Sequence, residues 1–516
     1  MGNNPKETKM GNNLKEAKPV PTTKNTPDAN ATKGLKLPKD TKGITVKKAE
    51  DFSEWYTQLI QKADLADYSA VSGCIVYKPA GYAIWEKIQQ IVDTKLKAMG
   101  VQNASFPMLI PESLLKKEAA HVQGFAPEVA WVTQGGNTVL GERLAIRPTS
   151  ETIMYDSYAK WIRSHKDLPL RLNQWNSVIR WEFKHPTPFL RSREFLWNEG
   201  HTCFATKAEA EQEIHDIIEM YQSVLKDYFA LPALVGKKSD AEKFAGAEYT
   251  VSTELLMPNG KSIQGPDAHF DGQNFAKAFD ITFLDKEAKR QHVWQNTWAI
   301  STRMIGVLLA IHGDDKGAVL PPQLAPIQVI IIPILFDDSK TKVLKEAQKI
   351  KAALEKKRIS VRLDDREGYS PGWKFNEWEV KGVPVRIELG PRDLQQKKAV
   401  IARRDTGEKK TAALGKVASE VPVLLAAIQD NLYHAAEKSL RGSLTTVATI
   451  TEAVKALESR KIIYAPWCGT AACEEALKEK TGAKSLNSPL QQSKISGNCF
   501  ACNRKATVWF YFGKSY

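Results

Sequence analysis

Several signals that would fix a function class are missing from this sequence. No stretch of about eighteen apolar residues occurs, so a membrane-spanning helix is not expected. The N-terminal part has no apolar segment of the kind that marks a secretory signal peptide. Neither a G-x-G-x-x-G nor a G-x-x-x-x-G-K-[ST] run is present, so a Rossmann or P-loop nucleotide site is not indicated.

Cysteine is scarce and unevenly placed. Of six cysteines, four form two close pairs near the C-terminus, whereas Cys74 and Cys203 are isolated and read as small buried residues. Disulfide scaffolds use cysteine differently, so this pattern indicates a metal site in a reducing compartment. We therefore expect a cytoplasmic protein.

Acidic residues are outnumbered by basic ones. The chain has 59 Asp and Glu against 73 Lys and Arg, which gives a net charge of +14. Such an excess suits a polyanionic partner, with nucleic acid as the default, but it also serves solubility alone. Charge leaves both interpretations open.

The N-terminal segment, residues 1–45, is poor in apolar residues and holds nine Lys against four acidic residues. It cannot bury enough surface to offset the entropy of ordering, so we predict a disordered basic extension. Its lysines could contact phosphates of a nucleic acid non-specifically. The alternative is a solvated tail without a partner.

The length of 516 residues suggests about three domains. Apolar residues at helical spacing predict a helix over 81–99, with further helices over 207–229 and 297–312. Strands are expected near 143–147, 170–183 and 194–204. After residue 322, strands at 327–335, 358–364 and 382–389 with a helix at 340–356 give a βαβ signal, and a helix over 417–438 follows.

The cysteine pairs have the spacing of a metal site. Cys468 and Cys473 are separated by four residues, Cys499 and Cys502 by two, and 25 residues lie between the pairs. Four thiolates without an open position favour a structural Zn²⁺ rather than a catalytic one. The alternative is four thiols without a metal.

Arginines recur beside Glu and aromatic residues in the strand-rich part of the chain. They lie in the segments 147–151, 180–186 and 191–201, and another opens the apolar helix at 301–306. An Arg at the start of an apolar helix is costly unless a carboxylate or phosphate pairs with it. Singly, each Arg would be read as a surface ion pair; together they indicate an anion site.

From about residue 50 to its end, the chain resembles the prolyl-tRNA synthetases of the archaeal and eukaryotic type. Residues 81–107 are similar to class II motif 1, residues 180–201 to motif 2 and residues 299–306 to motif 3. Residues 147–151 resemble the proline-binding loop of the family. The resemblance implies proline–tRNA ligation with ATP, Mg²⁺ and tRNA(Pro), through a prolyl-adenylate, in a homodimer.

The resemblance also implies a multidomain α+β and α/β fold. Its parts would be a disordered extension at 1–45, a class II antiparallel-sheet catalytic domain at 46–325, an α/β anticodon-binding domain at 326–435 and a zinc-binding α/β domain at 436–516. The interval 201–299 is filled by the helix and strands already predicted, so no separate editing domain is expected.

For the reaction, the resemblance makes Arg180 and Arg303 the catalytic cations. Adenylate formation gathers negative charge on phosphate oxygens, so fixed cations matter more than a general base. Arg180 would hold the α-phosphate and the proline carboxylate, and Arg303 the γ-phosphate. The other residues expected at ATP or its metal are Glu182, Arg191, Glu194, Phe195, Gln264 and Thr302.

The same resemblance outlines a proline pocket. Thr149 and Glu151 would meet the secondary ammonium, and Trp197 and Phe244 would form an apolar wall; without the resemblance these aromatics would be read as core. Besides Arg180, the remaining lining residues would be Glu199, His201, His269 and Ser301. A pocket of this size rejects smaller amino acids by only about 1–3 kcal/mol, so misactivation of alanine or cysteine is expected.

One segment departs from the family pattern. Where the family has a Gly-x-Thr-Ser-His run, this chain has Gly265, Pro266, Asp267, Ala268 and His269. Gln264 and His269 keep their types. The contacts made by the altered middle of this run cannot be carried over from the family.

The α/β domain resembles the anticodon-binding domain of class IIa synthetases, and its residues 374–393 resemble the run that this family uses against the anticodon. Arg and carboxylate side chains can read guanine edges, and Phe can stack on a base. The residues expected in this role are Phe375, Glu379, Arg386, Glu388, Arg392 and Asp393. Alternatively, Arg386 and Glu388 simply alternate out of a strand.

Two alternative functions stand beside the ligase. One is a synthetase-like protein that binds tRNA or signals without aminoacylating, and the other is a class II synthetase for another amino acid.

Overall fold

The computed structural model describes residues 43–121, 128–181, 186–495 and 497–516. Within it, Lys42–Tyr516 form one compact unit. The predicted basic extension therefore lies outside the described residues, except for 43–45. None of the helices in these ranges combines the length and apolarity needed to span a bilayer.

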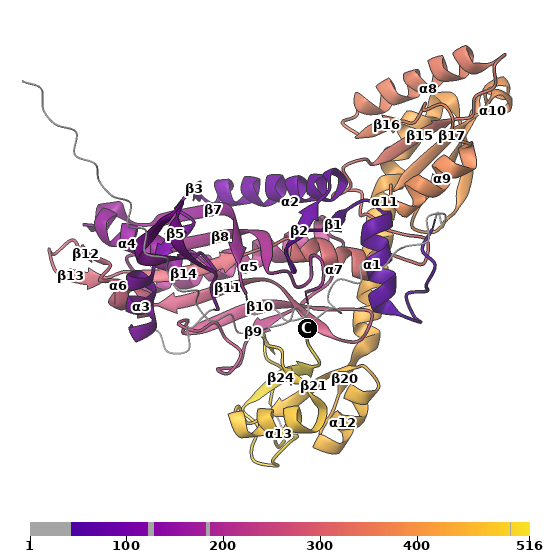
Figure 1. The fold of residues 1–516 in the computed structure, drawn as a ribbon. Coiled ribbons are helices and arrows are strands. Elements are labelled where there is room, and N and C mark those ends of the chain that lie inside the picture. Colours follow the sequence, from indigo (N-terminus) through magenta and orange to yellow (C-terminus); the bar gives the residue numbers. More distant parts are fainter. Residues whose placement is uncertain (1–42, 122–127, 182–185, 496) are drawn as a thin grey trace, which may run out of the picture. The chain divides into compact units, whose positions relative to one another are not determined.

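The described residues build their largest sheet from eight strands, all antiparallel except for the pairing of the last two (Figure 1). In spatial order they are β23 (Ser488–Pro489), β9 (Leu234–Lys237), β10 (Tyr249–Leu256), β11 (Ser262–Gly272), β14 (Trp294–Ala299), β8 (Glu194–Phe204), β7 (Leu170–Ile179) and β3 (Gln102–Asn103). The predicted antiparallel catalytic core is thereby confirmed.

One side of this sheet carries the largest hydrophobic cluster. Ile84, Ile88, Val92 and Leu96 recur at helical spacing and are fully buried, as the periodicity predicted. The helices that share this cluster are α1 (Phe52–Lys62), α2 (Pro79–Ala98), α5 (Lys207–Asp227) and α7 (Arg303–His312).

The opposite side of the sheet is only partly covered. Tyr155 and Tyr158 of α4 (Glu151–Trp161) pack with Phe275 and Phe279 of α6 (Asn274–Phe279) over Cys203. Beside them lie α3 (Glu112–His121) and a three-stranded sheet of β4 (Leu109–Pro111), β6 (Thr138–Ile146) and β5 (Trp131–Gly135). The part of this side that remains open holds the candidate site.

Smaller elements connect these layers. They are β1 (Ala66–Tyr68), β2 (Ile75–Tyr77), the 3-10 helix η1 (His165–Asp167), β12 (Thr282–Leu284) and β13 (Arg290–His292).

The helix predicted over 297–312 is wrong in its first part. Residues 297–299 belong to strand β14, and α7 begins only at Arg303. β14 lies between β8 and β11 and is buried on both sides, with Trp298 packed against Gly200. A central strand of this kind is continuously buried, so its pattern resembles that of a buried helix.

The predicted βαβ domain is present. β15 (Val329–Pro333) pairs in parallel with β16 (Val361–Leu363) and β17 (Val385–Leu389), and α8 (Lys340–Glu355) makes the crossover. Antiparallel strands β18 (Lys398–Arg403) and β19 (Lys409–Ala413) complete the sheet. The accompanying helices are α9 (Pro371–Val380), α10 (Pro391–Gln395) and α11 (Leu414–Ser443).

Helix α11 leads to a C-terminal α/β domain (Figure 1). Its N-terminal half packs into the core of the βαβ domain, whereas Leu440 joins a cluster with Leu234, Ile462 and Leu486. The C-terminal domain contains β20 (Leu444–Thr446), α12 (Ile450–Glu458), β21 (Ile462–Trp467), α13 (Ala471–Thr481), β22 (Lys484–Ser485) and β24 (Val508–Gly513).

The C-terminal domain is joined to the large sheet by main-chain pairing. Strand β23 leaves the domain and pairs with β9 at the sheet edge. The side-chain amide of Asn487 donates to the carbonyl oxygens of Leu234 and Ser252, at 3.0 and 3.2 Å. The C-terminal domain therefore holds the β9 edge of the large sheet, which lies next to the candidate site.

Candidate active site

A cavity of about 410 Å³ opens on the partly covered side of the large sheet. Strands β8, β11 and β14 supply its floor, and the segment before α4 and the turn after β9 supply its sides. The residues predicted for the site that line it are Thr149, Glu151, Arg180, Phe195, Trp197, Glu199, His201, Phe244, Gln264, His269, Ser301 and Arg303. The structure thus brings together residues that are up to 154 positions apart, from Thr149 to Arg303.

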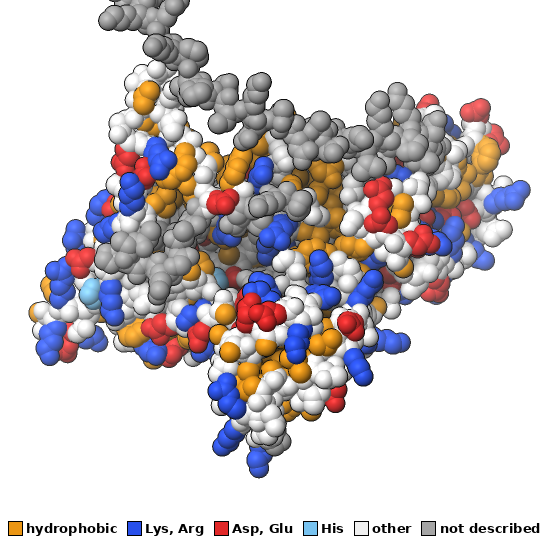
Figure 2. Space-filling model, turned by 60° about the horizontal axis from the view of Figure 1, so that its bottom comes forward, with side chains coloured by type: hydrophobic (Ala, Val, Ile, Leu, Met, Phe, Trp, Pro, Cys, Tyr) orange, Lys and Arg blue, Asp and Glu red, His pale blue; other side chains and the backbone are white. Residues whose placement is uncertain are grey.

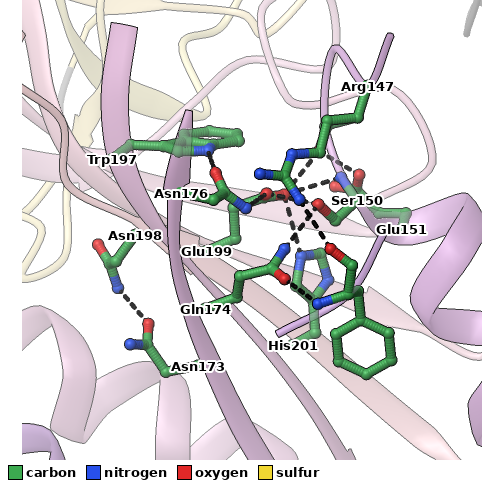
Figure 3. Close-up of polar contacts among 12 residues, drawn as sticks. Arg147, Ser150, Glu151, Asn173, Gln174, Asn176, Trp197, Asn198, Glu199 and His201 are labelled. Carbon is green, nitrogen blue, oxygen red and sulfur yellow. Dashed lines mark hydrogen bonds and ion pairs between the residues drawn. The ribbon is translucent and has the colours of Figure 1, made fainter. Parts of the chain in front are cut away.

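Glu199 is the best-connected side chain of this cavity (Figure 3). Its carboxylate accepts hydrogen bonds from the amide and hydroxyl of Ser150, at 2.8 and 2.6 Å, and from Asn176 at 2.6 Å. Its Oε2 also lies 3.3 Å from Nε2 of His201. Burial opposes ionisation, but these hydrogen bonds and His201 prevail and lower the pKa of Glu199 to about 2.

A second acidic group lies beside Glu199. Glu151 begins α4, is buried, and accepts a hydrogen bond from the hydroxyl of Thr149. Thr149 also lies 3.2 Å from Oε2 of Glu199. Glu151, Glu199 and His201 each place a ligand atom within 4.8 Å of the others. Such a group is suited to a cation, including an organic ammonium.

Two guanidinium groups face the same cavity. Arg180 donates to the carbonyl of Pro148 at 3.1 Å and lies over the rings of Phe195 and Trp197. Arg303 donates to the carbonyls of Leu190 and Gln264, at 3.3 and 3.2 Å. In the described ranges neither forms an ion pair with a carboxylate. Burial and the charge of Arg180 lower the pKa of Arg303. The pair forms a ready site for a phosphate or carboxylate.

Aromatic rings form the apolar part of the lining. Phe244 lies over His269, with 4.7 Å between ring centroids, and Trp197 meets Phe195 edge to face at 5.5 Å. The ring of His269 and the hydroxyl of Thr250 share a hydrogen bond of 2.8 Å. Burial lowers the pKa of His269, so its ring is neutral at pH 7. The cavity therefore joins cationic, acidic and apolar parts.

The segment that departs from the family pattern also contributes. Asp267 lines the cavity, accepts a hydrogen bond from the side chain of Gln264, and lies 3.5 Å from Nε2 of His269. Lys238 and Glu242 line the cavity as well. Sequence reasoning did not select these three as site residues. Lys238 and Glu242 follow β9 in a stretch without a recognisable motif, so the sequence held no signal for them.

Four predicted ATP residues lie elsewhere or are not described. Arg191 lines a neighbouring cavity of about 170 Å³, which it shares with Arg303, Gln264 and Tyr516. Glu194 lies next to Cys74, whose thiol pKa is raised by burial and by this carboxylate. Thr302 is buried and bonds to the hydroxyl of Tyr77 at 3.0 Å. Glu182 lies outside the described residues.

The neighbouring cavity lies where the C-terminal domain meets the sheet. Figure 2 shows Lys, Arg, Asp and Glu side chains gathered beside this domain. Lys238 pairs with Glu254 at 3.2 Å, and Lys484 of the C-terminal domain pairs with Glu242 at 3.0 Å. The last residues, Ser515 and Tyr516, line this cavity together with Arg303.

The predicted anticodon residues fall into two groups. Arg386 lies over the ring of Phe375 at 4.6 Å and pairs with Glu388, which also binds Lys409 at 2.9 Å. Glu379 and Arg386 line a cavity of about 140 Å³. The remaining two residues lie on α10, where Arg392 is exposed and Asp393 accepts the backbone N–H of Gly390 at 2.8 Å.

The four C-terminal cysteines come together as the spacing predicted. Their sulfur atoms all lie within 4.8 Å of one another; Sγ of Cys468 is 3.6 Å from that of Cys473 and 3.7 Å from that of Cys502, and the sulfur atoms of Cys473 and Cys499 are 4.0 Å apart. A tetrahedron with Zn–S bonds of about 2.3 Å has edges of roughly 3.8 Å. The donor set and its spacing thus fit Zn²⁺. Arg504 lowers the pKa of Cys502 to about 6, which favours a thiolate.

Three family models match the chain. The class II core domain of tRNA synthetases for G, H, P, S and T matches residues 136–312. An anticodon-binding domain matches residues 328–424. The C-terminal domain of prolyl-tRNA synthetase matches residues 450–516. These ranges contain six of the eight strands of the large sheet, the five strands of the βαβ domain and the four clustered cysteines.

Curated relatives match over nearly the whole chain. The cytoplasmic proline–tRNA ligase of Arabidopsis thaliana is 48% identical over 482 residues, which cover 92% of this chain and 91% of the relative. Proline–tRNA ligase 2 of Clostridioides difficile strain 630 is 47% identical over 471 residues, 91% of this chain and 97% of the relative. A proline–tRNA ligase of Clostridium botulinum strain Loch Maree is 48% identical over 469 residues, with coverages of 90% and 97%.

Proposed function

The chain belongs to the prolyl-tRNA synthetases and is a proline–tRNA ligase, and on this premise we propose how its residues perform the reaction. The class II core implies ATP with Mg²⁺, and the anticodon-binding domain implies tRNA. The carboxylate of proline attacks the α-phosphate of ATP and pyrophosphate leaves. The prolyl group then passes from the adenylate to a ribose hydroxyl of tRNA(Pro), and AMP is released.

We propose that Arg180 and Arg303 stabilise the charge that develops during adenylate formation. Arg180 contacts the α-phosphate and the proline carboxylate, and Arg303 the γ-phosphate. The support is that both guanidinium groups face the cavity and donate only to backbone carbonyls in the described ranges. Fixed donors of this kind need no reorganisation when charge develops. Arg191, in the adjoining cavity, extends the phosphate site.

The adenine of ATP is proposed to lie in the aromatic part of the cavity. Phe195 and its neighbour Trp197 offer ring surface in the cavity, and Gln264 offers an amide. Mg²⁺ supplies charge neutralisation on the phosphates when it is bound with the nucleotide. Oxygen ligands suit Mg²⁺, but Glu194 does not line the cavity and lies beside Cys74 instead. Thr302 directly precedes α7, which begins at Arg303, and we propose that it acts indirectly by holding the start of this helix.

The proline ring is proposed to lie against Trp197 and Phe244, with its ammonium toward Glu151 and Thr149. Glu199 stays ionised because it accepts several hydrogen bonds, and it holds Thr149 and Ser150 in place. His201, His269 and Ser301 line the rest of the cavity. A wall of two rings rejects smaller side chains only weakly, so we propose that alanine and cysteine are activated at a lower rate.

The cysteine cluster is proposed to bind one structural Zn²⁺ through Cys468, Cys473, Cys499 and Cys502. The support is the donor set and the tetrahedral sulfur spacing. The metal would hold β21 and α13 to the turn that precedes β24. No catalytic step involves it, because four protein ligands leave no position for water.

The anticodon of tRNA(Pro) is proposed to meet Phe375, Glu379, Arg386 and Glu388. The side chains of the first three lie on one side of the βαβ domain around a small cavity and a cation–π contact. Arg392, exposed on α10, would extend this surface, and Asp393 would hold the start of α10. Guanine edges suit this mixture of donors and acceptors.

We also propose the domain boundaries, the oligomeric state and the location of the protein. Domain boundaries are placed near residues 45, 325 and 435, and the first 45 residues are a basic extension. The chain acts as a homodimer through the motif 1 region, residues 81–107. It works in the cytoplasm, as the name of the Arabidopsis relative states for that protein.

The observation that supports the proposal most is that Arg180 and Arg303, which pair with no carboxylate among the described residues, line the same cavity as Glu151 and Glu199. Amino-acid-dependent ATP–pyrophosphate exchange across all twenty amino acids tests it. Exchange driven chiefly by proline, and lost in Arg303→Ala, is the expected result. Exchange with no amino acid, from folded protein that holds zinc, would contradict it.

A further inference from the structure

Asn176 lies outside the cavity but touches two residues that line it. It belongs to β7, where it is the direct cross-strand partner of Trp197 on β8. Glu199 is the diagonal neighbour two residues further along β8. One short side chain therefore stands between the apolar wall and the buried carboxylate (Figure 3).

The hydrogen bonds of Asn176 fix the orientation of its amide. Its Nδ2 donates to Oε1 of Glu199 at 2.6 Å, and its Oδ1 accepts from the indole Nε1 of Trp197 at 2.7 Å. An ionised carboxylate only accepts and an indole N–H only donates, so a flipped amide would lose both bonds. Glu199 also accepts two hydrogen bonds from Ser150, so Asn176 links the indole of Trp197 to a carboxylate that is held in place.

The side chain of Trp197 has one hydrogen-bonding atom, the indole Nε1. It is half-buried, and its single polar atom bonds to Asn176. Its faces and edges contact Phe195 and the guanidinium of Arg180, at 5.5 and 5.1 Å. Rotation of the ring would therefore change the width of the apolar wall, whereas Arg180 keeps its hydrogen bond to the carbonyl of Pro148.

We propose that Asn176 is a positioning residue that sets the selectivity of the cavity for proline by fixing the ring plane of Trp197 against Glu199. This inference rests on the proposed placement of the proline ring against Trp197. Proline fills the space in front of the wall, whereas alanine is too small to reach it. A loosened indole thus weakens binding of proline more than binding of alanine.

Asn173 provides a matched control on the same strand. It lies three residues earlier and points to the other side of the sheet, where it accepts from Asn198 at 2.8 Å and donates to Asn103 at 2.8 Å (Figure 3). It is fully buried, whereas Asn176 is half-buried, so its loss disturbs the sheet at least as much. It does not touch the cavity.

The test compares ATP–pyrophosphate exchange with proline and with alanine in wild type, Asn176→Leu and Asn173→Ser. In Asn176→Leu we expect KM for proline to rise about tenfold, with kcat within about threefold and KM for ATP unchanged. The ratio of kcat/KM for proline over alanine should fall about tenfold. Asn173→Ser should keep the wild-type ratio, even where it lowers the melting temperature.

A double-mutant cycle with Trp197→Phe, which removes the indole N–H, separates this role from general loosening. In that background Asn176→Leu should change KM for proline by much less than in wild type, and the remaining change reports the hydrogen bond from Asn176 to Glu199. Should the leucine variant fail to fold, Asn176→Ser, too short to bridge both partners, gives the same readouts. An unchanged proline-to-alanine ratio in the Asn176 variants, or an equal fall in Asn173→Ser, would overturn the inference. Absence of proline-driven exchange in the wild type would instead overturn the proposed function, and the inference with it.

Discussion

The carboxylate of Glu199 accepts hydrogen bonds from both the backbone amide and the hydroxyl of Ser150, at 2.8 and 2.6 Å. This pair joins strand β8 to the segment that enters α4. Because Thr149 and Glu151 flank Ser150, the same contact places the two groups proposed to meet the proline ammonium. A single buried carboxylate thus organises one side of the cavity.

Replacing Glu199 with Gln should destabilise the protein and weaken proline binding. The new amide would present N–H groups to at least one donor among Ser150 and Asn176, and buried unsatisfied donors cost about 1–3 kcal/mol each. We expect a free energy of unfolding lower by roughly 2–3 kcal/mol and a proline KM at least tenfold higher. Urea denaturation and exchange kinetics measure these effects. A proline KM within twofold of wild type would contradict the role given to Glu199.

The low pKa of Glu199 predicts how stability depends on pH. The pKa is about 2 in the folded protein and 4.5 ordinarily, so the unfolded chain binds this proton first as pH falls. The contribution of Glu199, on the order of 3 kcal/mol, is full above about pH 4.5 and disappears as pH falls toward 2. Urea midpoints of wild type and Glu199→Gln should therefore converge over this window. A constant difference between pH 5 and pH 2.5 would show that the carboxylate does not titrate as stated.

The large sheet could be predicted in outline because its strands carry strong local signals. Residues 194–204 were predicted as a strand and form β8, and the periodicity of 81–99 gave α2 within two residues. Contacts across strands could not be obtained in this way. Asn176 carries no motif, and its role depends on the register that sets it opposite Trp197. Lys238 reaches the cavity only because β9 ends beside it.

Other features escaped prediction because they depend on partners distant in sequence. The strand 297–299 was read as helix since burial on both sides of β14 hides the alternation of a strand. Strand β23 is two residues long and pairs with β9, more than 250 positions earlier in the chain. The local sequence of β23 contains no feature that predicts this pairing. By contrast, the spacing of the four cysteines along the chain was sufficient to predict that they come together in one cluster.

Replacing Arg180 with Ala should impair activation more than substrate binding. Arg180 is proposed to contact phosphate oxygens on which charge grows in the transition state, and a lost donor of this kind costs about 100- to 1,000-fold in kcat. Exposed Arg143, which pairs with half-buried Glu112 outside the cavity, is a matched surface control. Exchange kinetics of Arg180→Ala and Arg143→Ala measure the contrast. Equal kcat in wild type and Arg180→Ala would remove Arg180 from the proposed mechanism.

Removal of the metal should act on the C-terminal domain first. Cys468→Ser and Cys499→Ser should lower the zinc content from one ion per chain to nearly none, because a tetrahedral site rarely survives loss of a thiolate. Cys74, isolated beside Glu194, is the control, and Cys74→Ser should keep the zinc. Atomic absorption after dialysis gives the metal content, and thermal unfolding gives the change in stability. Zinc retained at one per chain in the Cys468 variant would exclude the four-cysteine site.

Loss of Arg386 should separate tRNA recognition from activation of proline. Arg386→Ala removes a cation beside Phe375 in the βαβ domain, far in sequence from the residues of the cavity. We expect KM for tRNA(Pro) to rise about tenfold, in the range of one lost base contact. Proline-driven exchange without tRNA should be unchanged. A fall in both reactions would indicate a folding defect rather than a contact with the anticodon.

Charging of tRNA tests the central claim most directly. Transcripts of tRNA(Pro) and of a non-cognate tRNA would be incubated with labelled proline, ATP and Mg²⁺, using wild-type protein and Arg303→Ala. We predict rapid attachment of proline to tRNA(Pro) alone, and a loss of at least 100-fold in the variant. Failure of the folded, zinc-containing wild type to charge tRNA(Pro) would contradict the account, as would full activity of Arg303→Ala.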